Sequence, residues 1–176
     1  MTTSLVLTFI GPDRPGLVNA ISEKIAAGGG SWLESRLVHL AGQFTGIVLV
    51  RAPASAAPGL TAALAELQAD GLSVTVAEGR ETPPAQDYET LLLEVLGHER
   101  PGIVRDVTQT LRKLGVNIEE LSSTIESAPF TGEEMFRAVL NVSVPAHVAV
   151  DDVRHGLEKL ADEIMVDLKT AAEVAV

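Results

Sequence analysis

The chain has 176 residues, of which 46% are hydrophobic and 21% charged, and its net charge at neutral pH is −11. This composition is typical of a folded globular protein, and the acidity disfavours direct binding to the phosphate backbone of nucleic acids. The absence of cysteine excludes disulfides, thiolate metal ligands and a cysteine nucleophile.

The first half of the chain predicts the order strand, helix, strand, strand, helix, strand. An apolar, β-branched run indicates a strand, and a helix follows with apolar residues at helical spacing until a run of three glycines ends it. The strands are expected at 5–10, 32–40, 44–50 and 72–77, the helices from Pro15 to the glycines at 28–30 and around Leu60 to Leu67.

The second half repeats the first. The motif GPDRPGLV at 11–18 matches GHERPGIV at 97–104, an offset of 86 residues. The same offset aligns 44–46 with 130–132, and about six extra residues are expected near 131–136. The repeat predicts strands at 91–96, 117–127, 134–144 and 164–169 and helices at 101–114 and 148–162.

A βαββαβ order folds as an antiparallel sheet with both helices on one face. The fold class is therefore α+β, with two ferredoxin-like domains at 1–82 and 89–176 and a linker at 83–88 around adjacent prolines. We expect the two sheets to pair within the chain or across a homodimer.

Charge is uneven between the halves. Residues 1–86 carry five basic and seven acidic residues, whereas residues 87–176 carry eight and seventeen. The excess of acid in the second half provides either an acidic surface for a partner or, in the interpretation we favour here, a solvated face that aids solubility.

Both halves share the pattern Gly-x-(Asp/Glu)-Arg-Pro-Gly between the first strand and the first helix. The first glycine suits a turn with positive φ, the proline suits the first helical turn, and the second glycine would let a ligand approach the backbone. Amide groups at the helix start and the arginine could bind a carboxylate, while the acid could bind an ammonium group. The pattern thus indicates either an amino-acid site or a tight structural turn, with about equal weight.

Other chemistry finds little support in the sequence. The four histidines show no metal-ligand spacing, the serines lack a nucleophile motif, and the adjacent acids do not form a dyad. We therefore predict no enzyme activity, no metal and no cofactor. No apolar run could span a membrane and the N-terminus lacks a signal pattern, so a cytoplasmic location is expected.

The loop motif, followed by Gly30-Ser31-Trp32 in one half and Gly115-Val116-Asn117-Ile118 in the other, resembles the ACT domain family. The resemblance implies βαββαβ modules that bind small effectors, usually amino acids, beside the strand-to-helix loop. The family's second-strand asparagine is Asn117 in one half and is replaced by Ser31 in the other, which favours the second half as a ligand site. The predicted ligand-binding residues are Gly11, Asp13, Arg14, Gly16, Leu17, Ser31, Gly97, Glu99, Arg100, Gly102, Ile103 and Asn117.

More narrowly, Glu34-Ser35-Arg36-Leu37 leading to Phe44-Thr45 resembles the subfamily of free-standing tandem ACT repressors of the glycine cleavage system. This resemblance implies a non-catalytic sensor of glycine or a near relative that modulates transcription by contacting a DNA-binding activator rather than DNA. The alternative is a regulatory subunit or effector-binding module of an amino-acid or one-carbon metabolic enzyme.

Overall fold

A computed structural model describes residues 1–80, 88–128, 132–160 and 164–170 of the chain. The chain divides into two compact units, Met1–Thr82 (unit 1) and Pro83–Val176 (unit 2). The predicted linker at 83–88 lies outside the described residues except for Tyr88, which is the first residue of a strand.

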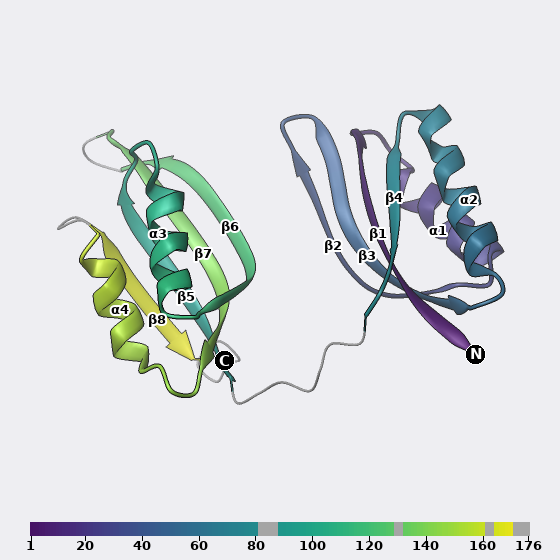
Figure 1. Cartoon of the computed structure of the whole chain (residues 1–176). Helices are drawn as coiled ribbons and strands as arrows, with labels where there is room; N and C mark the ends of the chain where they lie inside the picture. Colours follow the sequence, from purple (N-terminus) through teal and green to yellow (C-terminus); the bar gives the residue numbers. More distant parts are fainter. Residues whose placement is uncertain (81–87, 129–131, 161–163, 171–176) are drawn as a thin grey trace. The chain divides into compact units, whose positions relative to one another are not determined.

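Unit 1 is a four-stranded antiparallel sheet in the order β2-β3-β1-β4, with its helices on one face (Figure 1). Side chains alternate along the strands, so Leu5, Leu7 and Phe9 of the first strand point to the helices and are buried. The elements are β1 (Thr2–Pro12), α1 (Leu17–Ala27), β2 (Ser31–Leu40), β3 (Gln43–Pro53), α2 (Ala57–Ala65), the short 3₁₀ helix η1 (Glu66–Asp70) and β4 (Ser73–Glu78).

Unit 2 has the same topology, with strand order β6-β7-β5-β8 and both helices on one face of the sheet (Figure 1). Its elements are β5 (Tyr88–His98), α3 (Ile103–Lys113), β6 (Asn117–Ser127), β7 (Glu134–Pro145), α4 (Val150–Glu158) and β8 (Met165–Thr170). The predicted α+β fold of two βαββαβ domains is confirmed.

Each core lies between the sheet and its two helices. Leu17, Ile21 and Ile25 place one buried stripe on α1, and Ile103, Val107 and Leu111 repeat it on α3. No polar or charged residue of the described part of the chain is buried. Hydrophobic burial therefore dominates the stability of both units.

The first helix of each unit starts two residues later than predicted. Gly16 and Gly102 precede α1 and α3 with φ of 92° and 90°, a conformation that residues with a side chain rarely adopt. Pro15 and Pro101 therefore lie before the helix rather than in its first turn, which corrects the prediction.

The first glycine of the motif has a different role from the one predicted. Gly11 and Gly97 are not among the glycines with positive φ and lie inside β1 and β5. A Cβ atom at Gly11 would lie 2.6 Å from the carbonyl oxygen of Gly71. Close approach of a neighbouring backbone, rather than a turn, thus requires glycine at this position.

The hairpins differ between the units. Ala41 and Gly42, both with positive φ, connect β2 to β3 in two residues. Gly11 pairs with Phe44 whereas Gly97 pairs with Phe136, so the predicted alignment of Phe44 with Phe130 is wrong. The six extra residues lie between the central strands of unit 2, as predicted. The connection between β6 and β7 has six residues, 128–133, against two in unit 1, and β6 and β7 are each one residue longer than β2 and β3; residues 129–131 lie outside the described residues.

The second strand of each unit contains a β-bulge at the equivalent position. The register shifts between Trp32 and Glu34 in β2 and between Ile118 and Glu120 in β6.

The helices in the described part of the chain are all too short or too polar to cross a membrane.

Candidate functional site

The two strand-to-helix loops are anchored in the same way. The backbone N–H of Asp13 donates to the carbonyl oxygen of Gly42 at 2.9 Å, and that of Glu99 donates to the carbonyl of Glu134 at 3.0 Å. Each loop is therefore tied to the hairpin beside it, and the side chain of the aspartate or glutamate remains exposed. A loop fixed in this way presents its polar groups to solvent in a defined arrangement.

Arg14 in unit 1 is held by a neutral group. Its Nη2 donates to the carbonyl oxygen of Asp70 at 3.0 Å, where η1 ends. No described carboxylate lies within ion-pair distance of this guanidinium. The positive charge and most of its hydrogen-bond donors thus remain open to an anion.

Arg100 in unit 2 is held by a carboxylate. Its Nη1 donates to Asp106 Oδ2 at 2.8 Å, and Arg105 Nη2 donates to Asp106 Oδ1 at 2.9 Å. Hydrogen bonds from Arg100 first, and from Arg105 second, lower the pKa of Asp106 below its ordinary value of 3.8. Asp106 therefore already compensates the charge that was predicted to bind a ligand.

The starts of α1 and α3 offer backbone groups only. Neither Gly16 nor Gly102 supplies a side-chain cap, and the side chains of Leu17 and Ile103 are buried in the cores. In unit 2 the Ile103 N–H donates to the carbonyl of Arg100 at 3.3 Å. A ligand carboxylate would meet amide groups and the positive end of the helix dipole at these positions.

The acids of the two loops differ in their surroundings. Asp13 Oδ2 lies 3.8 Å from His39 Nε2, across the end of β2. Glu99 is exposed and has no ion pair with a described side chain. Both could reach an ammonium group, and neither is committed to a strong internal bond.

The structure does not bring Ser31 or Asn117 to the loop of its own unit. Asn117 pairs with Ser143, which pairs with Thr90, whereas the loop follows Gly97 seven residues further along β5. At roughly 3.3 Å per residue the separation is about 23 Å, too far for one amino acid to bridge. The same register separates Ser31 from Gly11–Gly16 in unit 1.

Asn117 has partners at its own end of the sheet. Its Nδ2 donates to Glu119 Oε1 at 2.6 Å, and Ser143 Oγ donates to the same oxygen at 2.9 Å. The amide is thus partly used inside unit 2.

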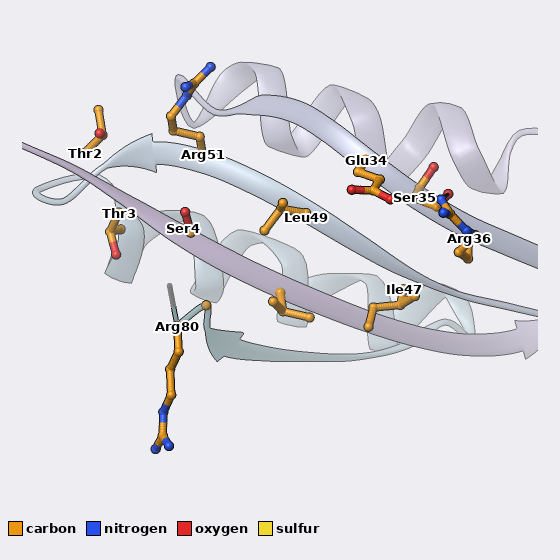
Figure 2. A pocket seen from close by; sticks show the side chains of 12 residues that line it. Thr2, Thr3, Ser4, Glu34, Ser35, Arg36, Ile47, Leu49, Arg51 and Arg80 are labelled. Carbon is orange, nitrogen blue, oxygen red and sulfur yellow. Dashed lines mark hydrogen bonds and ion pairs between the residues drawn. The ribbon is translucent and has the colours of Figure 1, made fainter. Parts of the chain in front are cut away.

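Sequence reasoning missed a groove on the sheet face of unit 1 that the helices leave uncovered, which we call open face 1. The groove has a volume of about 740 Å³. Its apolar lining residues include Val6, Ile47 and Leu49. Figure 2 shows Arg51 and Arg80 extending away from Ile47 and Leu49. The alternation of outward residues in β1 and β3 was the signal that could have revealed it.

The described part of the chain contains no group of three or more histidine or acidic side chains that could hold a metal ion. Two βαββαβ units with the same loop before the first helix define a tandem protein of the ferredoxin-like α+β class, and comparison with known proteins gives the family.

Two ACT domain family models match the chain, one over residues 3–77 and the other over residues 91–162. The two matches together cover most of the chain and coincide with the two units. The chain therefore belongs to the ACT domain family, whose members are regulatory modules that typically bind small effectors.

Two curated relatives match nearly the whole chain. Phosphoserine phosphatase SerB2 of Mycobacterium tuberculosis is 32% identical over 171 residues, which are 94% of this chain but 40% of that protein. The glycine cleavage system transcriptional repressor of Escherichia coli is 27% identical over 176 residues, covering 98% of this chain and 89% of the repressor.

Two solved structures share the fold. An unknown protein from Galdieria sulphuraria superposes with a TM-score of 0.84 at 29% identity, covering 97% of this chain and 99% of its own. A crystal structure described as a glycine cleavage system transcriptional repressor has a TM-score of 0.70 at 18% identity, with the same coverage, and supports the fold alone.

Proposed function

We propose that this protein is a non-catalytic sensor that binds a small amino acid at the strand-to-helix loop of unit 1. The ligand carboxylate would meet Arg14 and the first amide groups of α1, and Asp13 would face the ammonium group. A ligand as small as glycine suits a loop whose Gly16 carries no side chain. The observation that supports this choice of unit is that Arg14 is bonded to a neutral carbonyl, whereas Arg100 is bonded to Asp106.

This choice revises the expectation from sequence, which favoured the loop of unit 2 because of Asn117. Asn117 lies at the far end of its sheet from the loop and donates to Glu119, which supports leaving it out of the proposed site. The site proposed here therefore uses neither Asn117 nor Ser31.

We further propose that the bound state is passed to a DNA-binding regulator by protein contact, and so modulates transcription. The relative that supports this role is the Escherichia coli repressor, which matches almost end to end. A net charge of −11 is unfavourable for contact with DNA itself and leaves a protein partner as the target.

The ligand is tested first by thermal shift across the common amino acids. A ligand at one hundred times its Kd stabilises the protein by about 2.7 kcal/mol, which is measurable. Calorimetric titration of the best ligand then compares wild type with Arg14→Ala, for which loss of a charge-assisted hydrogen bond predicts at least about tenfold weaker binding. The absence of any stabilising amino acid would contradict the sensor role.

Arg100→Ala and Ser31→Ala are matched controls. Both should bind the ligand as wild type does if the site lies in the loop of unit 1. Weaker binding by Arg100→Ala together with unchanged binding by Arg14→Ala would move the site to unit 2. A Gly102→Val variant is unsuitable for this purpose, because its backbone strain lowers stability whether or not a ligand binds there.

The regulatory role is tested by deleting the gene in the source organism. Transcripts of the genes for glycine breakdown should rise and lose their response to glycine. A second candidate function, an effector module for a metabolic enzyme, rests on the match to the phosphatase, of which this chain spans two fifths. Unchanged transcripts combined with altered phosphoserine phosphatase activity on adding the protein would favour that candidate.

A further inference from the structure

The groove on open face 1 gathers most of the positive charge of unit 1. Residues 1–80 contain five lysine and arginine residues, and three of them, Arg36, Arg51 and Arg80, line the groove. The carboxylate that lines it, that of Glu34, pairs with Arg36 at 3.1 Å. In a protein whose net charge is −11, this concentration of guanidinium groups along one hollow favours the binding of an anion.

The charges of Arg51 and Arg80 are not compensated by any described side chain. Neither guanidinium forms an ion pair or a hydrogen bond within the part of the chain that the structure describes. The two remaining cations of unit 1, Arg14 and Lys24, lie outside the groove and are bonded to a carbonyl and to a carboxylate. The groove therefore holds the two guanidinium groups of unit 1 that remain available to a ligand, and each can donate two parallel hydrogen bonds to one anionic group.

The strand register sets Arg51 and Arg80 on either side of Ser4. Ser4 of β1 pairs with Arg51 of β3, and its carbonyl accepts a hydrogen bond of 2.8 Å from the N–H of Gly79, the neighbour of Arg80. Because adjacent strands lie about 4.8 Å apart, the backbones that carry the two arginines are roughly 10 Å apart. Both side chains are exposed and extended (Figure 2), so rotation about their side-chain bonds would bring both guanidinium groups onto an anion above Ser4.

Small residues keep the surface between the two arginines low. Gly79 carries no side chain, and a Cβ atom there would lie 2.9 Å from the Cβ of Ser4. The hydroxyl of Ser4 can itself donate a hydrogen bond to an anion. The space between the two arginines thus offers three groups that donate to one negative charge.

The groove becomes apolar in the next rows of the sheet. Val6 pairs with Leu49, and both side chains are half-buried, while Ile47 in the row beyond is 46% exposed. These rows begin about 7 Å from Ser4, since two residues along a strand advance the chain by that distance. Covering this surface with an apolar group is favourable. The groove therefore has a cationic end and an apolar floor, and its volume is typical of a small-molecule site.

Unit 2 does not repeat this arrangement. Ser143 occupies the position of Arg51, and its Oγ donates to Glu119 at 2.9 Å. The register places Lys169 on the same sheet face, but two residues further along the sheet from Thr90. Thr90, which stands where the serine stands in unit 1, is therefore not flanked by two cations.

We propose that the groove on open face 1 binds a small organic anion, in which a phosphate or carboxylate group is attached to an apolar body. The anionic group would bind above Ser4 between Arg51 and Arg80, and the apolar body would cover Val6 and Leu49. A free amino acid suits this groove poorly, because its ammonium group would face the same arginines. The groove and the strand-to-helix loop lie at opposite ends of β1, so this inference is independent of the proposed amino-acid sensor.

The first test titrates the full-length protein with matched probes. Phenyl phosphate and benzoate carry an anionic group on a benzene ring, benzyl alcohol is neutral, and inorganic phosphate has no apolar body. Amide NMR shifts should locate both organic anions at Ser4, Val6 and Gly79, with binding at least about tenfold tighter than that of benzyl alcohol or inorganic phosphate.

The ranking of the two organic anions identifies the charged group, and either order supports the proposal. The absence of saturable binding of both anions below about 10 mM would overturn it. Shifts confined to another part of the chain, or equally tight binding of benzyl alcohol, would overturn it as well.

The second test removes the cations one at a time. Arg51→Gln and Arg80→Gln should each weaken the binding of phenyl phosphate at least about tenfold, because each variant loses charge-assisted hydrogen bonds to the anion. Lys24→Gln is the matched control, since it removes the same charge from unit 1 but on α1, at the helix-covered face of the sheet. Equal weakening by all three variants, or by none of them, would overturn the proposal.

The third test concerns the apolar floor. Val6→Thr keeps nearly the same shape but places a hydroxyl under the apolar body of the ligand. It should weaken the binding of phenyl phosphate severalfold and leave that of inorganic phosphate unchanged. Unchanged binding of phenyl phosphate would contradict the role of the floor.

The last test shows whether a second copy of the chain covers the groove. Light scattering gives the mass of the protein while phenyl phosphate is titrated at protein concentrations from about 10 to 200 µM. An affinity that does not change over this range supports the proposal. A mass that doubles while the binding of phenyl phosphate disappears would overturn it.

Discussion

The loops of units 1 and 2 carry the same motif but hold its arginine differently. Arg14 donates to a backbone carbonyl, whereas Arg100 donates to Asp106. Ala20 occupies the position in α1 that Asp106 occupies in α3. A residue one helical turn beyond the motif thus decides whether the arginine is available to a ligand.

The glycines of the motif behave alike in both units, because they serve the backbone. Gly16 and Gly102 have φ near 90°, and Gly11 and Gly97 are buried inside β1 and β5. The motif therefore specifies a turn in both units, and in our proposal it forms a binding site only where the surroundings leave the arginine charge uncompensated.

The largest expected effect is on the free energy of unfolding and concerns the hydrophobic cores, which are alike in the two units. Leu7 and Leu93 occupy equivalent central positions and are fully buried. Leu7→Ala and Leu93→Ala should each lower the free energy of unfolding by about 2–5 kcal/mol, through lost burial and an unfilled cavity. Denaturant titration measures both. A loss below about 1 kcal/mol in one variant would show that the two cores are not equivalent.

The next effect concerns the turn glycines. Gly16→Val and Gly102→Val should each cost about 1–3 kcal/mol, because a β-branched residue is strained at a φ near 90°. Gly59→Ala in α2 is the control. Its Cβ would meet no atom within 4 Å, and alanine in a helix should raise stability by about 0.5–1 kcal/mol. Equal behaviour of all three variants would contradict the assignment of strain.

The variant Ala20→Asp tests whether a carboxylate at this helix position makes the arginine unavailable. It places a carboxylate at the position in unit 1 that Asp106 occupies in unit 2, where it should compete for Arg14. We expect amino-acid binding to weaken at least about tenfold in calorimetry, as for the loss of one hydrogen bond to a charged group. Asn19→Asp, which adds the same charge one position earlier, is the control. Equal weakening by both variants would indicate a general effect of charge.

A smaller effect concerns the dependence of stability on pH. Because the folded pKa of Asp106 lies below 3.8, its bonds to Arg100 and Arg105 contribute fully above that pH and are lost as the pH falls through the folded pKa. Asp106→Asn should therefore be less stable than wild type at pH 7, and the difference should shrink in strong acid. Denaturant midpoints measured across this range provide the check.

Glu99→Gln is the control for the pH experiment, since Glu99 lies on the same loop without an ion pair to a described side chain. The difference in stability between wild type and Glu99→Gln should not shrink in strong acid, whereas the difference for Asp106→Asn should. A constant gap between wild type and Asp106→Asn would show that the ion pair does not form in solution.

Much of the fold could be predicted from sequence, because the apolar periodicity and the repeat of 86 residues are carried by the residues themselves. Helix starts were placed two residues early, since a proline is compatible with both a turn and a first helical position. The alignment of Phe44 with Phe130 was wrong because it followed the local Phe-Thr-Gly identity. The strand register shows that Phe136, which pairs with Gly97, is the equivalent of Phe44.

The candidate site was harder to predict, because its properties depend on distant residues. Asp70, which holds Arg14, is 56 residues away in sequence. The separation of Asn117 from Gly97–Gly102 follows from strand pairing, which a motif does not encode. The alternation of outward residues in β1 and β3 indicated open face 1, but the register was needed to show which residues of neighbouring strands lie together on it.

The bulges of β2 and β6 affect how the chain tolerates changes in length. Leu33 and Glu119 are the extra residues of the two bulges. Trp32 and Glu34 pair with the adjacent residues Val50 and Leu49, so the register of β2 would be regular without Leu33. Loss of one codon at either bulge would thus leave every other side chain on its present face. Loss of a codon elsewhere in the same strand would invert the faces of all residues on one side of it.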